Sequence, residues 1–395
     1  MRLDASPYAR ALRTTRCNRS RRIGVENGVS RTMLSAACVA LLVACQPAAG
    51  GGSRSPQSSA AATPNATPTA SAPAPSPMVS LNCRLPVTTW NQTTYSYSGG
   101  FVTFPRGTLR EDPAGVIKAI GDGELGTDAT PVLRAYSDSG PPFYDLAMKR
   151  WVPVGAAQAS PDGSRYAFIS PPFGGPQSPV SVIRIATGAD SVFNVRTQPW
   201  TPTDWFKVGD FDGRYVYLLP PRSGQLPQGV WRLDTDTGSL VQLSRQASGV
   251  LVRFPLLWVG RVNPADPSPP TQAQEGQLFD SLVQVNLTTR AETTWIYRPG
   301  EAISLIGLDN DGHPVVSVSH GPDFNSTAGT VLLLGSPGDS GTQISSGSVP
   351  LSAMEADAGR IWFGSAQGIY LWTPVGGLQR AFPYGQPIMP AGRCV

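Results

Sequence analysis

The chain has 395 residues, of which 42 are glycine and 39 are proline, and only 15% are charged. This composition disfavours a mostly helical protein and favours many short strands joined by turns, in a chain long enough for a large core. The formal net charge is +4, but residues 1–44 carry a net +6, which leaves −2 for the rest of the chain. A nucleic-acid-binding domain would need a basic stripe on its surface, and the sequence after residue 44 contains none.

The first predicted element is the apolar segment MLSAACVALLVA at residues 33–44, which follows a run of arginines. As a helix it would be about 18 Å long, too short for the roughly 30 Å hydrocarbon core of a bilayer. Basic residues before it and small residues after it are typical of a secretory signal peptide. The upstream stretch is long for a leader, so Val29 and Met33 are alternative starts. Ser20-Arg21-Arg22 also has a faint likeness to a twin-arginine signal.

The end of this segment, Leu42-Val43-Ala44-Cys45, resembles the lipobox of bacterial lipoproteins. The resemblance implies that a lipid is attached to the Cys45 thiol and that cleavage before Cys45 makes it the mature N-terminus. Two acyl chains, such as palmitate, hold a protein on a membrane where a single chain does not. We therefore expect a protein anchored to the cell membrane and facing the extracellular or periplasmic side. An ordinary secretion signal is the alternative.

A low-complexity stretch at residues 46–79 consists almost entirely of Ala, Pro, Ser, Thr, Gly and Gln. It cannot bury enough apolar area to fold, so we expect a solvated tether. The predicted organisation is a leader and signal peptide at 1–44, a lipidated cysteine with a disordered linker at 45–79, and a folded domain at 80–395.

Five cysteines occur in the chain, at positions 17, 38, 45, 83 and 394. The first two lie in the leader, and Cys45 is the expected lipid site. Cys83 and Cys394 remain, one at each end of the folded region, and an exported chain with one remaining pair favours a disulfide. We therefore predict a Cys83–Cys394 bond, which requires the two ends of the domain to meet. Two free thiols are the alternative.

Between these cysteines a pattern recurs about every 50 residues: a turn with glycine, a short apolar run, and then two strands joined by a polar turn. The marker glycines are Gly100, Gly163, Gly213, Gly260, Gly312 and Gly359. The strand–turn–strand copies are FYDLAMKRWVPV (143–154), VIRIATGADSVFNV (182–195), VWRLDTDTGSLVQL (230–243), LVQVNLTTRAETTWIY (282–297), VLLLGSPGDSGTQI (331–344) and IYLWTPVGGLQRAF (369–382). VGRV at 259–262 is a poorer copy of the marker.

A period near 50 residues with four strands per unit is typical of a β-propeller. We predict an all-β protein with a single propeller of six four-stranded blades, seven being the alternative, in a ring closed by the Cys83–Cys394 disulfide. Ser160-Pro161-Asp162-Gly163, followed by SRYAFIS, resembles the WD40-like repeat of the TolB family. That resemblance implies the fold and an exported setting, and no particular activity.

The turn Asp309-Asn310-Asp311-Gly312 is similar to the start of a calcium loop. A full EF-hand needs further oxygen ligands, whereas HPVVSVSH follows here as a strand. Asp309 and Asp311 are thus candidate calcium ligands, with a simple turn as the alternative, and no other cofactor is expected. The acidic segment GDGELGTD (121–128) has the same two interpretations, of which a solvated loop is favoured.

Gly338-Asp339-Ser340-Gly341 looks like the nucleophile motif of chymotrypsin-like proteases. A serine nucleophile needs a histidine base, and the only histidines, His313 and His320, lack that family's sequence context. The stretch occupies a hairpin turn of the repeat, and the needs of that turn account for these residues without a catalytic role. The histidines are seven residues apart on one strand, so they point to opposite faces and do not share a metal.

Six-bladed propellers include calcium-dependent lactonases, which carry acidic and amide side chains around the central channel. In this chain Asp210, Asp309 and Glu355 lie near the starts of their units and are the candidates, with turn roles favoured. The proline-rich insertions 171–179, 220–229 and 263–277 fall between second and third strands, so they should gather on one face, where loops often bind partners.

These observations favour a membrane-anchored, non-catalytic binding or scaffold module for a protein, peptide or glycan, without nucleic acid as a partner. A calcium-dependent hydrolase, lactonase or lyase is the first alternative, so enzymatic activity stays open. A component of an envelope assembly complex, which the TolB resemblance would allow, is the second.

Overall fold

The computed structural model describes residues 81–91, 93–121, 123–136, 139–170, 178–195, 206–219, 229–245, 249–265, 279–320, 329–347 and 349–395. All of them belong to one compact unit. The leader, Cys45, the tether and most of the proline-rich insertions lie outside this set. No helix in the described part of the chain is long and apolar enough to cross a membrane.

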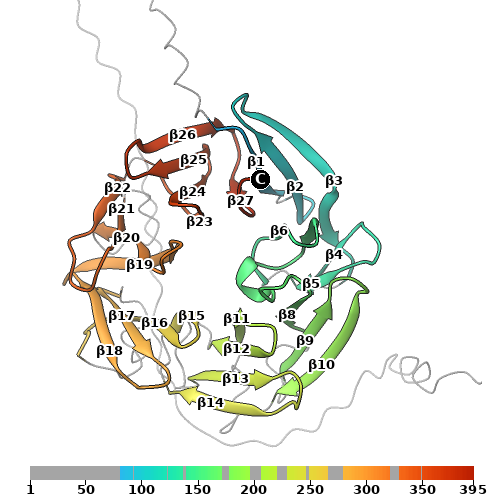
Figure 1. Cartoon of the computed structure of the whole chain (residues 1–395), viewed down its shortest axis with the longest axis horizontal. Helices are drawn as coiled ribbons and strands as arrows, with labels where there is room; N and C mark the ends of the chain where they lie inside the picture. Colours follow the sequence, from blue (N-terminus) through green and yellow to red (C-terminus); the bar gives the residue numbers. More distant parts are fainter. Residues whose placement is uncertain are drawn as a thin grey trace, which may run out of the picture. The chain divides into compact units, whose positions relative to one another are not determined.

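Six antiparallel sheets are arranged in a ring (Figure 1). The first consists of β27 (Ile388–Pro390), β1 (Arg84–Asn91), β2 (Ser96–Thr103) and β3 (Thr108–Ala119). The second consists of β8 (Arg165–Ile169), β9 (Ser178–Arg184) and β10 (Ala189–Val195). A single bridge between Ala159 and Tyr166 takes the innermost position of this second sheet.

The third, fourth and fifth sheets each contain four strands in chain order. The sixth has four strands in the same order, and its second strand pairs with β27, so it is continuous with the first sheet. The third consists of β11 (Lys207–Phe211), β12 (Tyr215–Leu219), β13 (Val230–Asp234) and β14 (Leu240–Ser244). The fourth consists of β15 (Gly249–Arg253), β16 (Leu256–Arg261), β17 (Ser281–Asn286) and β18 (Glu292–Tyr297). The fifth consists of β19 (Glu301–Leu308), β20 (Pro314–His320), β21 (Thr330–Leu333) and β22 (Thr342–Ser345). The sixth consists of β23 (Ala353–Asp357), β24 (Arg360–Ser365), β25 (Gly368–Thr373) and β26 (Gly377–Pro383). These sheets are the blades of the predicted propeller.

An irregular sector lies between the first and second blades. It consists of β4 (Glu124–Thr127), β5 (Arg134–Tyr136), β6 (Phe143–Asp145), β7 (Arg150–Val152) and the short 3-10 helix Ala156–Gln158. β4 and β5 extend the first sheet beyond β3, whereas β6 and β7 pair only with each other. The indole of Trp151 packs against Phe101 of β2, which joins this sector to the first blade.

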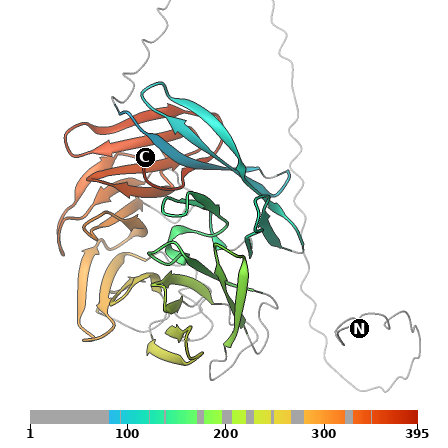
Figure 2. The ribbon, with the colours of Figure 1, turned by 45° about the vertical axis from the view of Figure 1, so that its right-hand side comes forward.

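The ring closes where the last strand joins the first. β27 pairs with β1, with Val87 opposite Pro390, so the first blade takes its innermost strand from the C-terminus. The Cys83–Cys394 disulfide lies beside this pairing and joins Cα atoms 5.6 Å apart across 311 residues of sequence. Figure 2 shows the first and sixth blades side by side, as Figure 1 does. The predicted disulfide and the predicted meeting of the two ends are confirmed.

Apolar contacts between neighbouring blades form the core. Val182 of β9 packs with Val216 of β12, and Val315 of β20 packs with Phe363 of β24. Blades bury both faces of their sheets, so strands need not alternate between apolar and polar residues. The sequence 166–168 illustrates this, because Tyr166, Ala167 and Phe168 are all at most 3% exposed.

The expected first unit was wrong in its strand assignment. The stretch SGGFVTF lies in β2, the third strand of its blade, and not in a second strand after a turn. The copy at 143–154 forms the separate β6–β7 hairpin and not the outer pair of that blade. The cause is the ring closure. Because β27 occupies the innermost position of the first blade, β1, β2 and β3 become its second, third and fourth strands. Gly260 is likewise inside β16 and not in a turn.

Candidate functional site

The turns that follow the innermost strands lie on one face of the ring, because the blades repeat the same up-and-down order. β11, β15, β19 and β23 are the innermost strands of blades three to six, and their C-terminal ends point toward this face. The marker glycines Gly163, Gly213, Gly312 and Gly359 lie in these turns with positive φ angles of 67–97°, which favour glycine. The strand ends that bracket the proline-rich insertions lie on the opposite face.

An ion pair joins two of these innermost strands. The guanidinium of Arg253, at the end of β15, donates to the carboxylate of Asp210 on β11. The Asp210 side chain is only 14% exposed. Burial raises its pKa to about 6, although the charge of Arg253 acts in the opposite direction. The pair therefore holds a partly desolvated carboxylate on the innermost strand of the third blade.

Glu355 on β23 is a second carboxylate in this region. Burial raises its pKa to about 7, and the nearby charge of Asp357 raises it further. Arg393 and Arg253 oppose this shift. Arg253 thus forms an ion pair with Asp210, and its charge also lowers the pKa of Glu355. A carboxyl group with a pKa near 7 can exchange a proton at neutral pH.

A groove lies beside this cluster, between the turns of the fifth and sixth blades. Its volume is about 730 Å³, within the range of about 300–1,000 Å³ usual for small-molecule sites. Its polar lining comes from Asp309, Asn310, Asp311, His313, Asp357, Arg360 and Arg393. Leu333, Ile361 and Trp372 supply apolar lining. The groove therefore presents both charge signs around a partly apolar surface.

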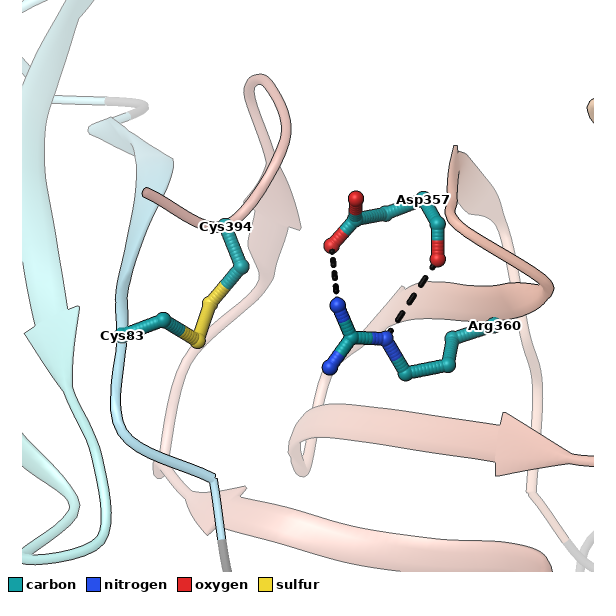
Figure 3. The surroundings of a disulfide bond; sticks show 4 residues. All are labelled: Cys83, Asp357, Arg360 and Cys394. Atoms are coloured by element: carbon teal, nitrogen blue, oxygen red, sulfur yellow. Dashed lines mark hydrogen bonds and ion pairs between the residues drawn. A yellow bond between two sulfur atoms is a disulfide. The ribbon is translucent and has the colours of Figure 1, made fainter.

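Figure 3 shows the edge of this region next to the disulfide. Arg360 forms an ion pair with Asp357 at 3.1 Å, and its Nε also donates to the Asp357 backbone carbonyl at 3.4 Å. The Asp357 side chain is 10% exposed. This pair neutralises one charge of each sign and holds the turn between β23 and β24 together.

The predicted calcium turn shows a definite hydrogen-bond pattern. The carboxylate of Asp309 accepts from the backbone N–H groups of Asp311 and His313 at 2.9 and 2.8 Å, and lies 3.2 Å from the His313 Nδ1. Ligand atoms of these three residues lie within 4.8 Å of one another. They supply three ligand atoms, whereas calcium takes six to eight oxygens. Because the same Asp-to-backbone bonds occur at Asp212, the turn interpretation accounts for Asp309.

The other residues singled out from the sequence lie in turns or strands of the fold. Asp339 accepts hydrogen bonds from the backbone N–H groups of Gly335 and Gly341, as expected for a hairpin turn rather than a protease motif. His320 ends β20, opposite Glu301 in register. The segment 121–128, which was expected as a loop, contains strand β4, and Asp128 pairs with Lys118 at 2.8 Å.

The structure thus pairs Asp210 with Arg253 and places Asp309 in the lining of the groove, while the charges of Arg253 and Arg393 act on Glu355. Arg253, Arg393 and Trp372 were not predicted. One signal could have found Arg253, because it ends the apolar run GVLVR one blade after Asp210. No such signal marks Arg393, whose position depends on ring closure.

No protein-family model and no curated protein matches the chain. Solved structures with a similar fold include the acylaminoacyl peptidase of Pyrococcus horikoshii, at 11% identity and a TM-score of 0.42, over 76% of this chain and 46% of that one. TolB from Acinetobacter baumannii is similar at 11% identity and a TM-score of 0.41, over 78% and 67%. Oligogalacturonate lyase in complex with manganese is similar at 13% identity and a TM-score of 0.44, over 77% of this chain and 86% of that one. The chain spans less than half the length of the peptidase.

Proposed function

We propose that this protein is a lipid-anchored, extracytoplasmic propeller that binds a protein, peptide or glycan in the groove between its fifth and sixth blades without catalysing a reaction. The lipobox-like residues 42–45 support the anchor. The Cys83–Cys394 bond supports an oxidising compartment, because disulfides persist outside the cytoplasm.

One observation carries the choice of binding over catalysis. Three of the carboxylates in this region are engaged: Asp210 by Arg253, Asp357 by Arg360, and Asp309 by its own turn. A calcium-dependent hydrolase would need several carboxylate and amide oxygens converging on one point. Paired charges beside a cavity suit recognition of a polar ligand better than they suit a metal centre.

Glu355 favours a hydrolase or lyase as the second candidate. Its pKa of about 7 suits a general acid or base, and perturbed groups of this kind cluster at active sites. It has one acidic neighbour, Asp357, which is already paired with Arg360. Asp357 is therefore not free to act as the second carboxylate of an acid–base mechanism with Glu355.

Site-specific photocrosslinking tests the proposal. A photoreactive residue at position 310, inside the groove, should crosslink a defined envelope component that mass spectrometry identifies. The same residue at position 236, in the turn after β13, is the control and should not. Turnover of ester, lactone or glycoside substrates that is lost in Glu355→Gln would instead establish the enzyme.

A further inference from the structure

We propose that the groove between the fifth and sixth blades recognises a dipolar ligand, namely a short peptide with a free amino end and a free carboxylate end. This inference rests on the proposed function and specifies its ligand class. It follows from the two charged side chains of opposite sign that line the groove without neutralising each other.

The acidic side is supplied by the turn between β19 and β20. Asp311 is exposed, and its carboxylate has no hydrogen-bond or ion-pair partner among the described residues, unlike that of Asp309. His313, whose side chain is 36% exposed, lies next to it and is held by Asp309. This wall can therefore accept hydrogen bonds from an ammonium group at the carboxylate of Asp311.

The basic side is supplied by the end of the chain. Arg393 is exposed, and within the described part of the chain its guanidinium has no ion-pair partner. Its charge lowers the pKa of Glu355, so it stands close enough to act on that carboxyl. Arg360, by contrast, is already bound to Asp357. Arg393 is thus the guanidinium open to an incoming carboxylate, which it can bind through two N–H groups.

Three apolar side chains also border the groove. Trp372 is 5% exposed and Ile361 is 2% exposed, and both line the groove with Leu333. The volume of about 730 Å³ is sufficient for a short peptide.

Ligands with one charge or none fit less well. A neutral glycan would partly desolvate Asp311 and Arg393 and leave both unpaired, which is costly. A simple anion would meet the carboxylate of Asp311, and a simple cation would meet Arg393. A zwitterion satisfies both groups at once.

Calorimetry on the full chain in detergent tests this with four forms of the tripeptide Ala-Leu-Ala: both ends free, acetylated, amidated, and blocked at both ends. The free peptide should bind at least about tenfold more tightly than either singly blocked form, because each form lacks one charge-assisted bond. Asp311→Asn should abolish the effect of acetylation only. Arg393→Gln should abolish the effect of amidation only.

Two matched controls are Asp236→Asn and Arg110→Gln, which remove exposed charges in the third and first blades and should change nothing. Equal affinity for all four peptides would overturn the dipolar specificity. A groove that binds maltotriose and ignores all four peptides would also overturn it and leave the binding function intact. Failure of both ligand classes, together with an absence of crosslinks at position 310, would overturn both proposals.

Discussion

The backbones of Arg84 and Val395 exchange two hydrogen bonds, with N···O distances of 2.6 and 2.9 Å, immediately beside the Cys83–Cys394 disulfide. The last residue of the chain is therefore paired with the start of β1. Ring closure thus combines a covalent bond with strand pairing between residues more than 300 positions apart. Several predictions about stability concern this seam and the charges next to it.

Removal of the disulfide should destabilise the ring without abolishing the fold. Replacing Cys83 and Cys394 by serine releases a loop of 311 residues, so the free energy of unfolding should fall by roughly 2–5 kcal/mol. Urea denaturation measures this. Reduction of the wild-type chain should have the same effect, and reduction of the double variant should have none. A variant as stable as wild type would show that β27–β1 pairing alone closes the ring.

A methyl group at Gly364 should open the same seam. A Cβ atom there would collide with the carbonyl oxygen of Ile388 and would lie 2.8 Å from the Cα of Met389, so β24 and β27 would have to separate. Gly364→Ala should reduce the free energy of unfolding by about 1–3 kcal/mol in urea denaturation. Gly385→Ala is the matched control, because no atom lies within 4 Å of its Cβ position. Equal costs at both positions would contradict the close approach.

Glu355 should make stability depend on pH. Its pKa is 4.5 in the unfolded chain and about 7 in the folded one, so between these values the folded state binds more protons. Stability should therefore fall as pH rises from about 4.5 to 7, by up to roughly 3 kcal/mol, and remain low above pH 7. Urea midpoints between pH 4 and 9 measure this.

Glu355→Gln isolates the Glu355 contribution to that dependence. The variant should be more stable than wild type at pH 8 and similar to it near pH 4.5, because the amide resembles the protonated acid. Glu111→Gln, an exposed change on β3, is the control and should follow the wild-type curve. A wild-type slope in the Glu355→Gln variant would assign the pH dependence to other groups.

The Asp210–Arg253 pair should show pH-dependent coupling. Arg253→Gln leaves a buried carboxylate without its partner, which should cost about 1–3 kcal/mol at pH 8, moderated because Arg253 is 45% exposed. A double-mutant cycle with Asp210→Asn measures the coupling energy. The coupling should vanish near pH 4, where Asp210 is protonated. Additive effects at pH 8 would mean that the ion pair contributes nothing.

The prediction of membrane attachment depends on Cys45. If a lipid is attached there, Cys45→Ala should release the protein from the membrane fraction, because a tether without acyl chains has no anchor. Cell fractionation and mass measurement of the mature N-terminus test this. Cys38→Ala, upstream in the leader, is the control and should remain membrane-bound. Retention of the Cys45→Ala protein in the membrane would contradict lipidation.

The repeat made the propeller predictable, because each blade restates the same turn and strand chemistry. Asp212-Gly213 and Asp311-Gly312 mark turns after innermost strands, and the observed turns are there. The first blade was mispredicted because its innermost strand, β27, comes from the far end of the chain. No local pattern encodes that exchange.

At the site, the carboxylates could be predicted from the sequence, whereas the arginines that act on them could not. Asp210 and Glu355 were candidates because they lie near the starts of their units, a position that periodicity reveals. The guanidinium groups whose charges act on them, Arg253 and Arg393, lie 43 and 38 residues away from them in the sequence. Only the curvature of the ring brings those guanidinium groups to the carboxylates.

The sequence by itself determined the all-β class, the repeating blades and the Cys83–Cys394 bond, because these depend on local turn chemistry, hydrophobic runs and the small number of cysteines. The tertiary structure alone decided which strand begins the ring, which carboxylates are paired and where a groove opens. Those features depend on side chains from different blades meeting in space. Their mutual distances are set by how the sheets close on one another, which no single segment specifies.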